Sequence, residues 1–394
     1  MEHHFPTIDY VMSLTPGGMR EGRDNVLKIM KYLGNPQDKL SVFHITGSNG
    51  KGSVCQMLSQ VLWKSFGKKV GLFTSPHFIK INERFQINGV CVSDESLENY
   101  YKKVIGTAEK IKVPLSFFEI QVIVMILYFY DEKVDYAVIE VGLGGTYDGT
   151  NIFQKPLACF ITSITLEHTH VLGKTRMSIL RNKLGIIKNG TSLYTPLRNK
   201  LIEKACRENN VQLHTLAKDE KKKTNLSGNH QQKNAGLVFE ALKDLGFETK
   251  KIKTGLQEIY NPGRFEWIAP HILVDTANNR ENIQILKRMV KKMNQKKMTI
   301  LYGTTQTDTD EAKKLAQIIP AGKRMLVDDF CERSLPSEKY NKGVKHADII
   351  HFFTEVKKMK KVLSDEDSTL IVYGSFYLVG EIMKLSRYQP FAMI

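Results

Sequence analysis

A glycine-rich segment at residues 47–53 carries the strongest chemical signal in the sequence. It lies between an apolar, strand-like run and an amphipathic helical run, and it consists of Gly47, Ser48, Asn49, Gly50, Lys51, Gly52 and Ser53. Small residues let backbone N–H groups surround a phosphate, Lys51 can neutralise the β- and γ-phosphates, and Ser53 can reach Mg²⁺. The inserted Gly52 departs from the usual GxxxxGK[ST] spacing. We expect a nucleotide phosphate-binding loop; the alternative is a flexible turn beside an unrelated lysine.

Two further polar residues follow predicted strands. Glu140 ends an apolar strand just before a Gly-Leu-Gly-Gly turn, and His168 lies a few residues beyond the next strand. The carboxyl ends of parallel strands are where α/β sheets bind ligands, and a carboxylate there suits Mg²⁺ that is also bound to nucleotide phosphates. Taken singly, Glu140 also fits a solvated strand end and His168 a structural histidine. Together with the glycine-rich segment they predict a shared metal site.

Strand-like runs alternate with amphipathic helical runs along the chain, which is typical of parallel sheets covered on both faces. The expected strands are 42–46, 70–74, 136–141, 157–161, 272–275, 298–302, 324–327, 349–353 and 370–373. Ser116 and Glu119 form a capping-box pattern before a wholly apolar helix. The segment 261–264, Asn-Pro-Gly-Arg, has the turn-forming residues expected of a hinge between two domains. We predict an α/β protein with a P-loop ATPase-type, mostly parallel sheet domain at 1–265 and a smaller Rossmann-like domain at 266–394.

Composition and charge narrow the function classes. The 394 residues carry 57 Lys+Arg against 41 Asp+Glu, but in scattered clusters without aromatic interleaving or zinc-finger spacing. This pattern favours anionic small ligands over nucleic acid. Five cysteines without a CxxC pair indicate a reducing compartment. The longest apolar run, 122–130, is shorter than the roughly 20 residues of a spanning helix, and no signal-peptide pattern opens the chain. We expect a cytoplasmic protein without a membrane or nucleic-acid partner.

A series of motifs, in this order and spacing, resembles the folylpolyglutamate and dihydrofolate synthases, a group within the ATP-dependent Mur ligase superfamily. Besides the glycine-rich segment, the motifs are Phe73-Thr74-Ser75-Pro76-His77, Asn82-Glu83-Arg84, Glu140-Val141-Gly142-Leu143-Gly144-Gly145, Asp148-Gly149-Thr150-Asn151, Asn182-Lys183-Leu184-Gly185, His230-Gln231 with Asn234-Ala235, Pro262-Gly263-Arg264-Phe265-Glu266 and Gly374-Ser375-Phe376-Tyr377. Each is modest evidence alone. The resemblance runs almost end to end and implies that 1–265 is a Mur ligase central-type domain with folate-binding loops.

The resemblance also implies a reaction. ATP phosphorylates a pterin-linked carboxylate to an acyl phosphate, and the amine of L-glutamate displaces phosphate to form an amide. The implied cofactors are ATP, Mg²⁺ in two sites and a CO₂-derived carbamate on Lys183. The carbamate makes chemical sense because an ammonium repels Mg²⁺ whereas a carbamate is an oxygen-donor anion. The alternative for Lys183 is an exposed helix lysine. The implied partners are small molecules only, and the chain is expected to be a monomer.

The resemblance assigns roles to particular residues by motif. The implied catalytic residues are Lys51, Lys183, His168 and Arg264. The implied metal ligands are Ser53, Ser75, Glu140, His168 and Lys183. The implied nucleotide contacts are Gly47, Asn49, Gly50, Lys51, Gly52, Ser53, Asn234, Arg264, Asp275 and Asn278. The implied substrate contacts are Ser75, Pro76, His77, Arg84, Ser116, Phe118 and Asp148, of which the last three match a pterin pocket; the alternative for Phe118 is a core phenylalanine.

Three positions depart from the family pattern. Asn278 stands where the family has a histidine that packs on adenine, the segment 307–310 lacks the lysine of an Asp-Lys-Asp element, and Thr146 replaces an arginine. These changes leave two alternatives open. One is a Mur-type ligase with another carboxylate acceptor, such as a cell-wall peptide, and the other is a nucleotide-binding protein whose ligase activity has decayed. The phosphate and metal core is intact.

Overall fold

The computed structural model describes residues 5–14, 22–217, 221–293, 297–344 and 347–393. The chain divides into two compact units. The first unit comprises Met1–Ser75, Asn82–Tyr260 and Phe391–Ile394, and the second comprises Pro76–Ile81 and Asn261–Pro390. These units differ from the expected domains in three short segments: Pro76–Ile81 and residues 261–265 belong to the second unit, and Phe391–Ile394 belongs to the first. The α/β fold class predicted from the sequence is confirmed.

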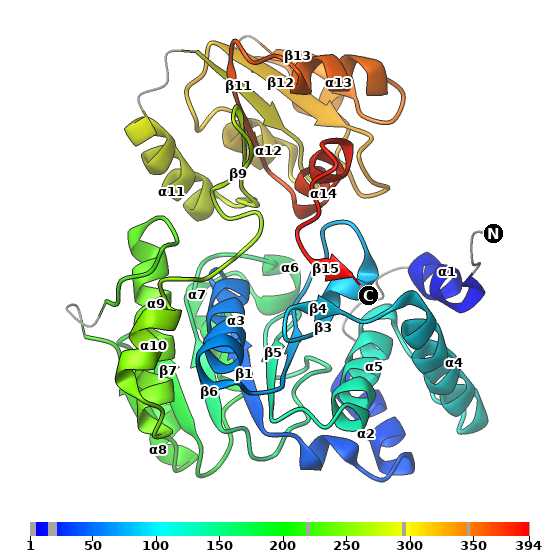
Figure 1. The fold of residues 1–394 in the computed structure, drawn as a ribbon, viewed down its shortest axis with the longest axis vertical. Coiled ribbons are helices and arrows are strands. Elements are labelled where there is room, and N and C mark those ends of the chain that lie inside the picture. The colour runs from blue at the N-terminus through cyan, green and yellow to red at the C-terminus, as the bar shows by residue number, and fades with distance from the viewer. Residues whose placement is uncertain (1–4, 15–21, 218–220, 294–296, 345–346, 394) are drawn as a thin grey trace. The chain divides into compact units, whose positions relative to one another are not determined.

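In the described part of the chain, the first unit is built on a nine-stranded sheet with the order β15-β4-β3-β2-β5-β1-β6-β7-β8 (Figure 1). Its strands are β1 Val42–Thr46, β2 Val70–Phe73, β3 Phe85–Ile87, β4 Val90–Cys91, β5 Tyr136–Glu140, β6 Ala158–Ile161, β7 Ser192–Thr195, β8 Gln212–Thr215 and β15 Ala392–Met393. The strands from β2 to β8 in this order run parallel, and β3 and β4 add an antiparallel edge. All five residues of β1 are buried, as expected for the centre of a parallel sheet.

Helices cover both faces of this sheet. Their bounds are α1 Pro6–Ser13, α2 Gly22–Tyr32, α3 Lys51–Gln60, α4 Asp94–Lys110, α5 Phe117–Asp131, α6 Thr169–Leu172, α7 Arg176–Leu184, α8 Lys200–Glu208, α9 Asn229–Asp244 and α10 Thr249–Gly255. Helices α3, α9 and α10 share one apolar core with the sheet, and α7 and α8 share another. The predicted capping box of Ser116 and Glu119 is present at the start of α5. Gly71 lets α5 approach β2, since a Cβ there would lie 2.8 Å from the Phe129 ring.

The register of the central strands decides where the site can form. Ile45 of β1 is paired with Glu140 of β5, and Thr46 is paired with Ile161 of β6. Because the three strands are parallel, their carboxyl ends meet at one edge of the sheet. The glycine-rich segment leaves β1 at this edge, so it emerges between the ends of β5 and β6.

The second unit has a six-stranded sheet among its described residues, in the order β13-β12-β11-β14-β10-β9. Its strands are β9 Glu266–Ala269, β10 Ile272–Val274, β11 Met298–Tyr302, β12 Lys323–Asp328, β13 Ala347–His351 and β14 Thr369–Tyr373, and its helices are α11 Arg280–Val290, α12 Thr309–Ala316, α13 Val356–Leu363 and α14 Phe376–Leu385. Only β9 is antiparallel to its neighbour. Side chains of Asn279, Asp308 and Ser375 cap α11, α12 and α14, which fixes where each helix begins.

Across the described residues, no helix combines the length and the apolar character needed to cross a membrane.

Candidate nucleotide and metal site

The glycine-rich segment forms a tight turn between β1 and α3. Gly47 has a φ of 147°, and a Cβ there would lie 1.9 Å from Thr162 Oγ1 at the end of β6. Gly50, in the left-handed region with a φ of 94°, is the N-cap of α3. Both positions therefore need glycine. The turn leads directly into the positive end of a ten-residue helix, which is the arrangement that binds phosphates in P-loops.

Residues just after β6 hold the turn from the other side. Asn49 N–H donates to Ser163 Oγ at 2.8 Å, and Thr162 Oγ1 donates to Asn49 O at 2.7 Å. Ser48 N–H donates to Ser163 O at 2.9 Å. Because these bonds join two strand ends, the turn is fixed by tertiary structure before any ligand binds.

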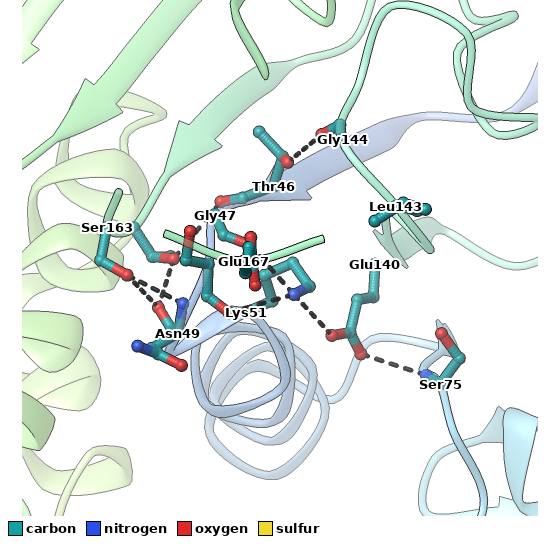
Figure 2. A network of polar contacts seen from close by, with 12 residues as sticks. Thr46, Gly47, Asn49, Lys51, Ser75, Glu140, Leu143, Gly144, Ser163 and Glu167 are labelled. Atoms are coloured by element: carbon teal, nitrogen blue, oxygen red, sulfur yellow. Dashed lines mark hydrogen bonds and ion pairs between the residues drawn. The ribbon is translucent and has the colours of Figure 1, made fainter. Parts of the chain in front are cut away.

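Lys51 and Glu140 lie together beside this turn (Figure 2). Lys51 Nζ donates to Gly47 O at 3.0 Å and lies 4.0 Å from Glu140 Oε1. Glu140 Oε2 accepts the Ser75 backbone N–H at 3.1 Å. Gly52 faces the same carboxylate, since a Cβ at this position would lie 3.7 Å from Glu140 Oε2. The structure thus brings the end of β5 to the turn, as the sequence predicts.

Helix α9 brings further side chains to the same turn. Gln231 Nε2 donates to Ser53 Oγ at 3.1 Å, and Asn234 Nδ2 donates to Gln231 Oε1 at 3.1 Å. A Cβ on Gly50 would lie 3.1 Å from Asn234 Oδ1. Asn234, an implied nucleotide contact, therefore lies beside the turn. Gln231, which was assigned no role, orients both Ser53 and Asn234; its only sequence signal was its place in a family motif.

Lys183 is a buried lysine paired with a carboxylate that the sequence analysis missed. Its side chain is 2% exposed, and Nζ lies 2.9 Å from Glu167 Oε1. Burial, with help from the charge of Lys51, lowers the pKa of Lys183 to about 8, although Glu167 opposes the change. Burial acts to raise the pKa of Glu167, but Lys51 and Lys183 outweigh it and hold that pKa below the usual value. The alternative of an exposed helix lysine at position 183 is wrong.

His168 belongs to the same electrostatic cluster. It has a left-handed backbone with a φ of 44° and immediately precedes α6. Burial lowers its pKa; Glu167 acts in the opposite direction, and Lys51 and Lys183 add to the lowering. The fold thus brings His168 and Lys183 into electrostatic range of the P-loop lysine, as expected. Glu167 could have been suspected only from its position next to His168.

The residues around the turn fit a magnesium ion at one position. Glu140 and the hydroxyl of Ser53 are hard oxygen donors of the type that Mg²⁺ prefers, and Glu140 is only 5% exposed, with Lys51 Nζ at 4.0 Å from its Oε1. An unmodified Lys183 does not fit a second position, since its ammonium already pairs with Glu167 and would repel a cation. No group of three or more His, Cys, Asp or Glu side chains converges anywhere in the described residues.

Of the three residues matched to a pterin pocket, Phe118 packs against the loop 142–151, Asp148 belongs to this loop, and Ser116 lies two residues before Phe118. The Phe118 ring packs on Gly142 so closely that a Cβ there would lie 2.3 Å from Cζ. Ser116 Oγ accepts the Glu119 N–H as a helix cap. Asp148 is 2% exposed, and its carboxylate accepts the Leu143 N–H at 2.8 Å. Asp148 therefore organises the loop from within.

Arg84, the residue before β3, contacts the first residue of α5. It is 5% exposed, and its guanidinium lies 5.3 Å from the centre of the Phe117 ring. This places a buried cation next to the segment that carries Ser116 and Phe118.

The remaining predicted residues lie in the second unit and are described within it. Arg264 donates to Thr276 Oγ1 and lies with its guanidinium 5.1 Å from the Phe376 ring centre. Asp275 accepts the backbone N–H groups of Phe265 and Ala277 at 2.9 and 2.8 Å. Burial raises its pKa, against the opposing charge of Arg264. Three other predicted residues are half-buried there: Pro76, His77, which meets the Tyr377 ring edge to face, and Asn278.

A phosphate-binding turn at the end of a central parallel strand, with a lysine and a strand-end carboxylate beside it, defines a P-loop nucleotide-binding protein. Residues 45–262 match the family model described as the Mur ligase middle domain. This match spans more than half of the chain, and the chain therefore belongs to the Mur ligase family.

Individual relatives point to one group within this family. The chain is 29% identical to the dihydrofolate synthase/folylpolyglutamate synthase of Bacillus subtilis, over 93% of this chain and 95% of that protein. It is similar to the crystal structure of folylpolyglutamate synthase from Thermotoga maritima, with 25% identity, a TM-score of 0.81 and coverage of 97% and 96% of the two chains. A folylpolyglutamate synthase bound to AMPPCP, an ATP analogue, matches with 25% identity, a TM-score of 0.79 and coverage of 96% and 98%.

These relatives confirm the predicted resemblance to folylpolyglutamate and dihydrofolate synthases and the predicted enzyme class, an ATP-dependent ligase that forms a C–N bond. ATP use and small-molecule substrates follow from the same comparisons.

Proposed function

We propose that the protein joins L-glutamate to dihydropteroate, to folate or to both, through an acyl phosphate formed with ATP. The observation that carries the proposal is that Lys51, Glu140 and the Ser75 backbone meet at the phosphate-binding turn, residues 47–53. The relatives of this chain are named dihydrofolate synthase or folylpolyglutamate synthase. The two alternatives from the sequence, another carboxylate acceptor and a decayed ligase, are tested together with it.

The turn would bind and orient the ATP phosphates. Backbone N–H groups at the start of α3 would contact the β- and γ-phosphates, and Lys51 would move from the Gly47 carbonyl to the phosphates at little cost, since its bond there is to a neutral acceptor. Phosphoryl transfer is accelerated mainly by positioning and by stabilising charge on the transferred group. Mg²⁺, held by Glu140, Ser53 and Ser75, would supply part of that charge stabilisation.

Lys183 would serve the site after carbamate formation. CO₂ reacts with a neutral amine, and with a pKa of about 8 roughly a quarter of Lys183 is neutral at pH 7.5. The product would be an anion with oxygen donors, suited to a second Mg²⁺ together with His168. Glu167, which now pairs with the ammonium at 2.9 Å, would then lose its partner. His168 remains available as a neutral donor because burial lowers its pKa.

The acceptor would be bound near the loop 142–151. Phe118 offers an aromatic face for a pterin ring, and Arg84 offers a buried cation nearby. Asp148 would shape this pocket, because Leu143 and Thr150 already donate to its oxygens. In the second unit, Arg264, Asp275 and Asn278 would contact the nucleotide.

Acceptor-dependent turnover tests the proposal. ADP release by the purified full chain is measured with ATP, Mg²⁺, L-glutamate and dihydropteroate or folate, omitting one component at a time, and the product is identified by mass. ADP release should require all components, and the product should gain one glutamate. Release that is indifferent to the pterin would contradict the proposal. A panel of other carboxylates, including cell-wall peptides, tests the first alternative, and tight ATP binding without any amide product would support the second.

Lys51→Met gives a matched check of the site. Losing one charged donor to the transferring group should lower kcat by about 10²- to 10³-fold. The control is Lys64→Met. Lys64 lies on the same helical segment and donates to Gln60, and its substitution should leave turnover unchanged.

We also propose that the protein is a monomer and that it is located in the cytoplasm. Light scattering during gel filtration should give a mass near 45.0 kDa; a stable dimer would contradict the first part, and fractionation of the source cells tests the second.

A further inference from the structure

His44 is a buried titratable residue that the proposed chemistry does not use. It is the middle residue of β1, 1% exposed, and it is paired with Ile139 of β5 and Cys159 of β6 on its two sides. A polar ring at such a position is costly unless it is hydrogen-bonded. Its Nε2 lies 2.9 Å from Thr150 Oγ1, on the loop that follows Glu140.

The hydroxyl of Thr150 is hydrogen-bonded to Asp148 as well as to His44. Thr150 Oγ1 donates to Asp148 Oδ1 at 2.5 Å, and Thr150 N–H donates to the same oxygen at 2.9 Å. Leu143 N–H donates to Oδ2 at 2.8 Å. A carboxylate that receives donors on both oxygens acts as the ionised acceptor. Because a threonine hydroxyl has one proton, which goes to Asp148, Thr150 can only accept from His44. His44 must therefore carry its proton on Nε2.

The charge state of His44 agrees with this arrangement. Burial, followed by the positive charge of Lys188, lowers its pKa to about 3, so the ring is neutral at physiological pH. Lys188 itself donates to Asn151 Oδ1 at 2.7 Å and to Gly185 O at 3.1 Å. Burial raises the pKa of Asp148, while the hydrogen bonds from Thr150 and Leu143 act to lower it.

The same strand contacts the loop at a second point. Thr46 Oγ1 donates to Gly144 O at 2.6 Å. Residues 44 and 46 point to the same face of β1, since side chains alternate along a strand. Thr46 immediately precedes the phosphate-binding turn, and Gly144 belongs to the loop that follows Glu140. The loop 142–151 is therefore fastened to the strand that leads into the turn by two buried side chains.

We propose that His44 is a positioning residue: through Thr150 it fixes the carboxylate of Asp148, and so sets the shape of the acceptor loop relative to the strand that carries the phosphate-binding turn. This inference rests on the proposed function in one respect: it takes the pterin acceptor to be the ligand of the loop 142–151. The relay from His44 through Thr150 to Asp148 is a structural statement that can be tested by itself.

The tautomer of His44 is the first test. Nitrogen NMR of the histidine rings, with His44→Gln used to assign the resonance among the 11 histidines, should show a neutral ring protonated at Nε2 that does not titrate between pH 5.5 and 8.5. In Thr150→Val this signature should change, because the acceptor is lost. A ring protonated at Nδ1, an imidazolium at neutral pH or a spectrum unchanged in Thr150→Val would overturn the proposal.

Paired variants test the positioning role. Thr150→Val should raise the KM of the pterin acceptor about 10- to 100-fold, the loss expected for one hydrogen bond to a charged group, with a smaller change for ATP. Thr150→Ser, which keeps the hydroxyl, should restore most of the loss. The kcat/KM for the acceptor should likewise be higher in His44→Gln than in His44→Leu, because the glutamine amide can still donate to Thr150 whereas leucine cannot.

Thr195→Val is the matched control for a purely structural effect. Thr195 is also fully buried, and its hydroxyl donates to Ile161 O at 2.8 Å and accepts from Leu197 N–H at 3.2 Å. It should lose stability without a change in acceptor KM. Equal kinetic profiles for Thr195→Val and Thr150→Val would overturn the proposal. If wild type shows no acceptor-dependent turnover, the proposed function fails, whereas the tautomer measurement still decides the relay.

Discussion

The ion pair of Lys183 and Glu167 predicts a pH-dependent loss of stability in Glu167→Gln. The carboxylate lies 2.9 Å from a lysine that is 2% exposed, and the pKa of this lysine is about 8 against an ordinary value of 10.5. Without Glu167, that pKa falls further, because burial and Lys51 are no longer opposed. The buried amine avoids an unpaired charge by releasing its proton.

Linkage gives the size of the effect. If the pKa of Lys183 falls far below the assay range, the added loss in free energy of unfolding is at most about 1 kcal/mol at pH 7.5, almost 3 kcal/mol near pH 6 and close to zero near pH 9. The sign follows from the direction of the shift: the unfolded lysine is protonated throughout this range, so releasing its proton in the fold costs more as the pH falls. The carboxylate of Glu167 stays ionised over this range, because its pKa is held below the usual value. Glu167 also raises the pKa of His168, so its loss makes a charged His168 less stable as well and widens the gap near pH 6 in the same direction.

Urea unfolding of wild type and Glu167→Gln at pH 6, 7.5 and 9, in buffer with a chelator and without CO₂, measures this difference. The gap in free energy of unfolding between the two proteins should widen by about 2 to 3 kcal/mol from pH 9 to pH 6. Glu208→Gln, which removes an exposed partner of Lys204, should show a gap that does not vary with pH. A gap for Glu167→Gln that is equally flat would refute the description of Lys183 as a buried lysine held charged by Glu167.

Three further predictions concern the turn, the buried lysine and the helix cap. Gly47→Ala should abolish ATP binding in a calorimetric titration, because a Cβ at this position would lie 1.9 Å from Thr162 Oγ1. Gly190→Ala is the control: no atom lies within 4 Å of a Cβ there, and ATP binding should remain intact. Lys183→Ala should lower turnover by about 10²-fold or more while ATP binding persists, with partial rescue by short carboxylates; full turnover would remove Lys183 from the mechanism. Ser116→Ala should cost about 1 kcal/mol of stability, as for other N-caps, and Ser93→Ala, which removes the cap of α4, should match this loss without affecting the acceptor KM; a rise in acceptor KM only in Ser116→Ala would show that Ser116 also contacts the acceptor.

Most of the secondary structure was predictable because its signals are local. The strands 42–46 and 298–302 agree with β1 and β11 at both ends, and the predicted cap at Ser116 begins α5. These features follow from runs of apolar residues and from capping side chains within a few positions of each other. Six short strands of the described residues were not expected: β3, β4, β7, β8, β9 and β15.

The sequence by itself determined the phosphate-binding turn and the strand-end carboxylate, since both depend on residue types next to a strand and a helix. Only the tertiary structure revealed the partnership of Glu167 with Lys183, the role of Gln231 beside Ser53 and the relay from His44 to Asp148. The long-range contacts among these join separate segments of the chain: Glu167 and Lys183 are 16 positions apart, His44 and Thr150 are 106 apart, and Ser53 and Gln231 are 178 apart. Local patterns carry no information on which distant polar group will satisfy a buried one, because that choice is made when the strands of the sheet come into register.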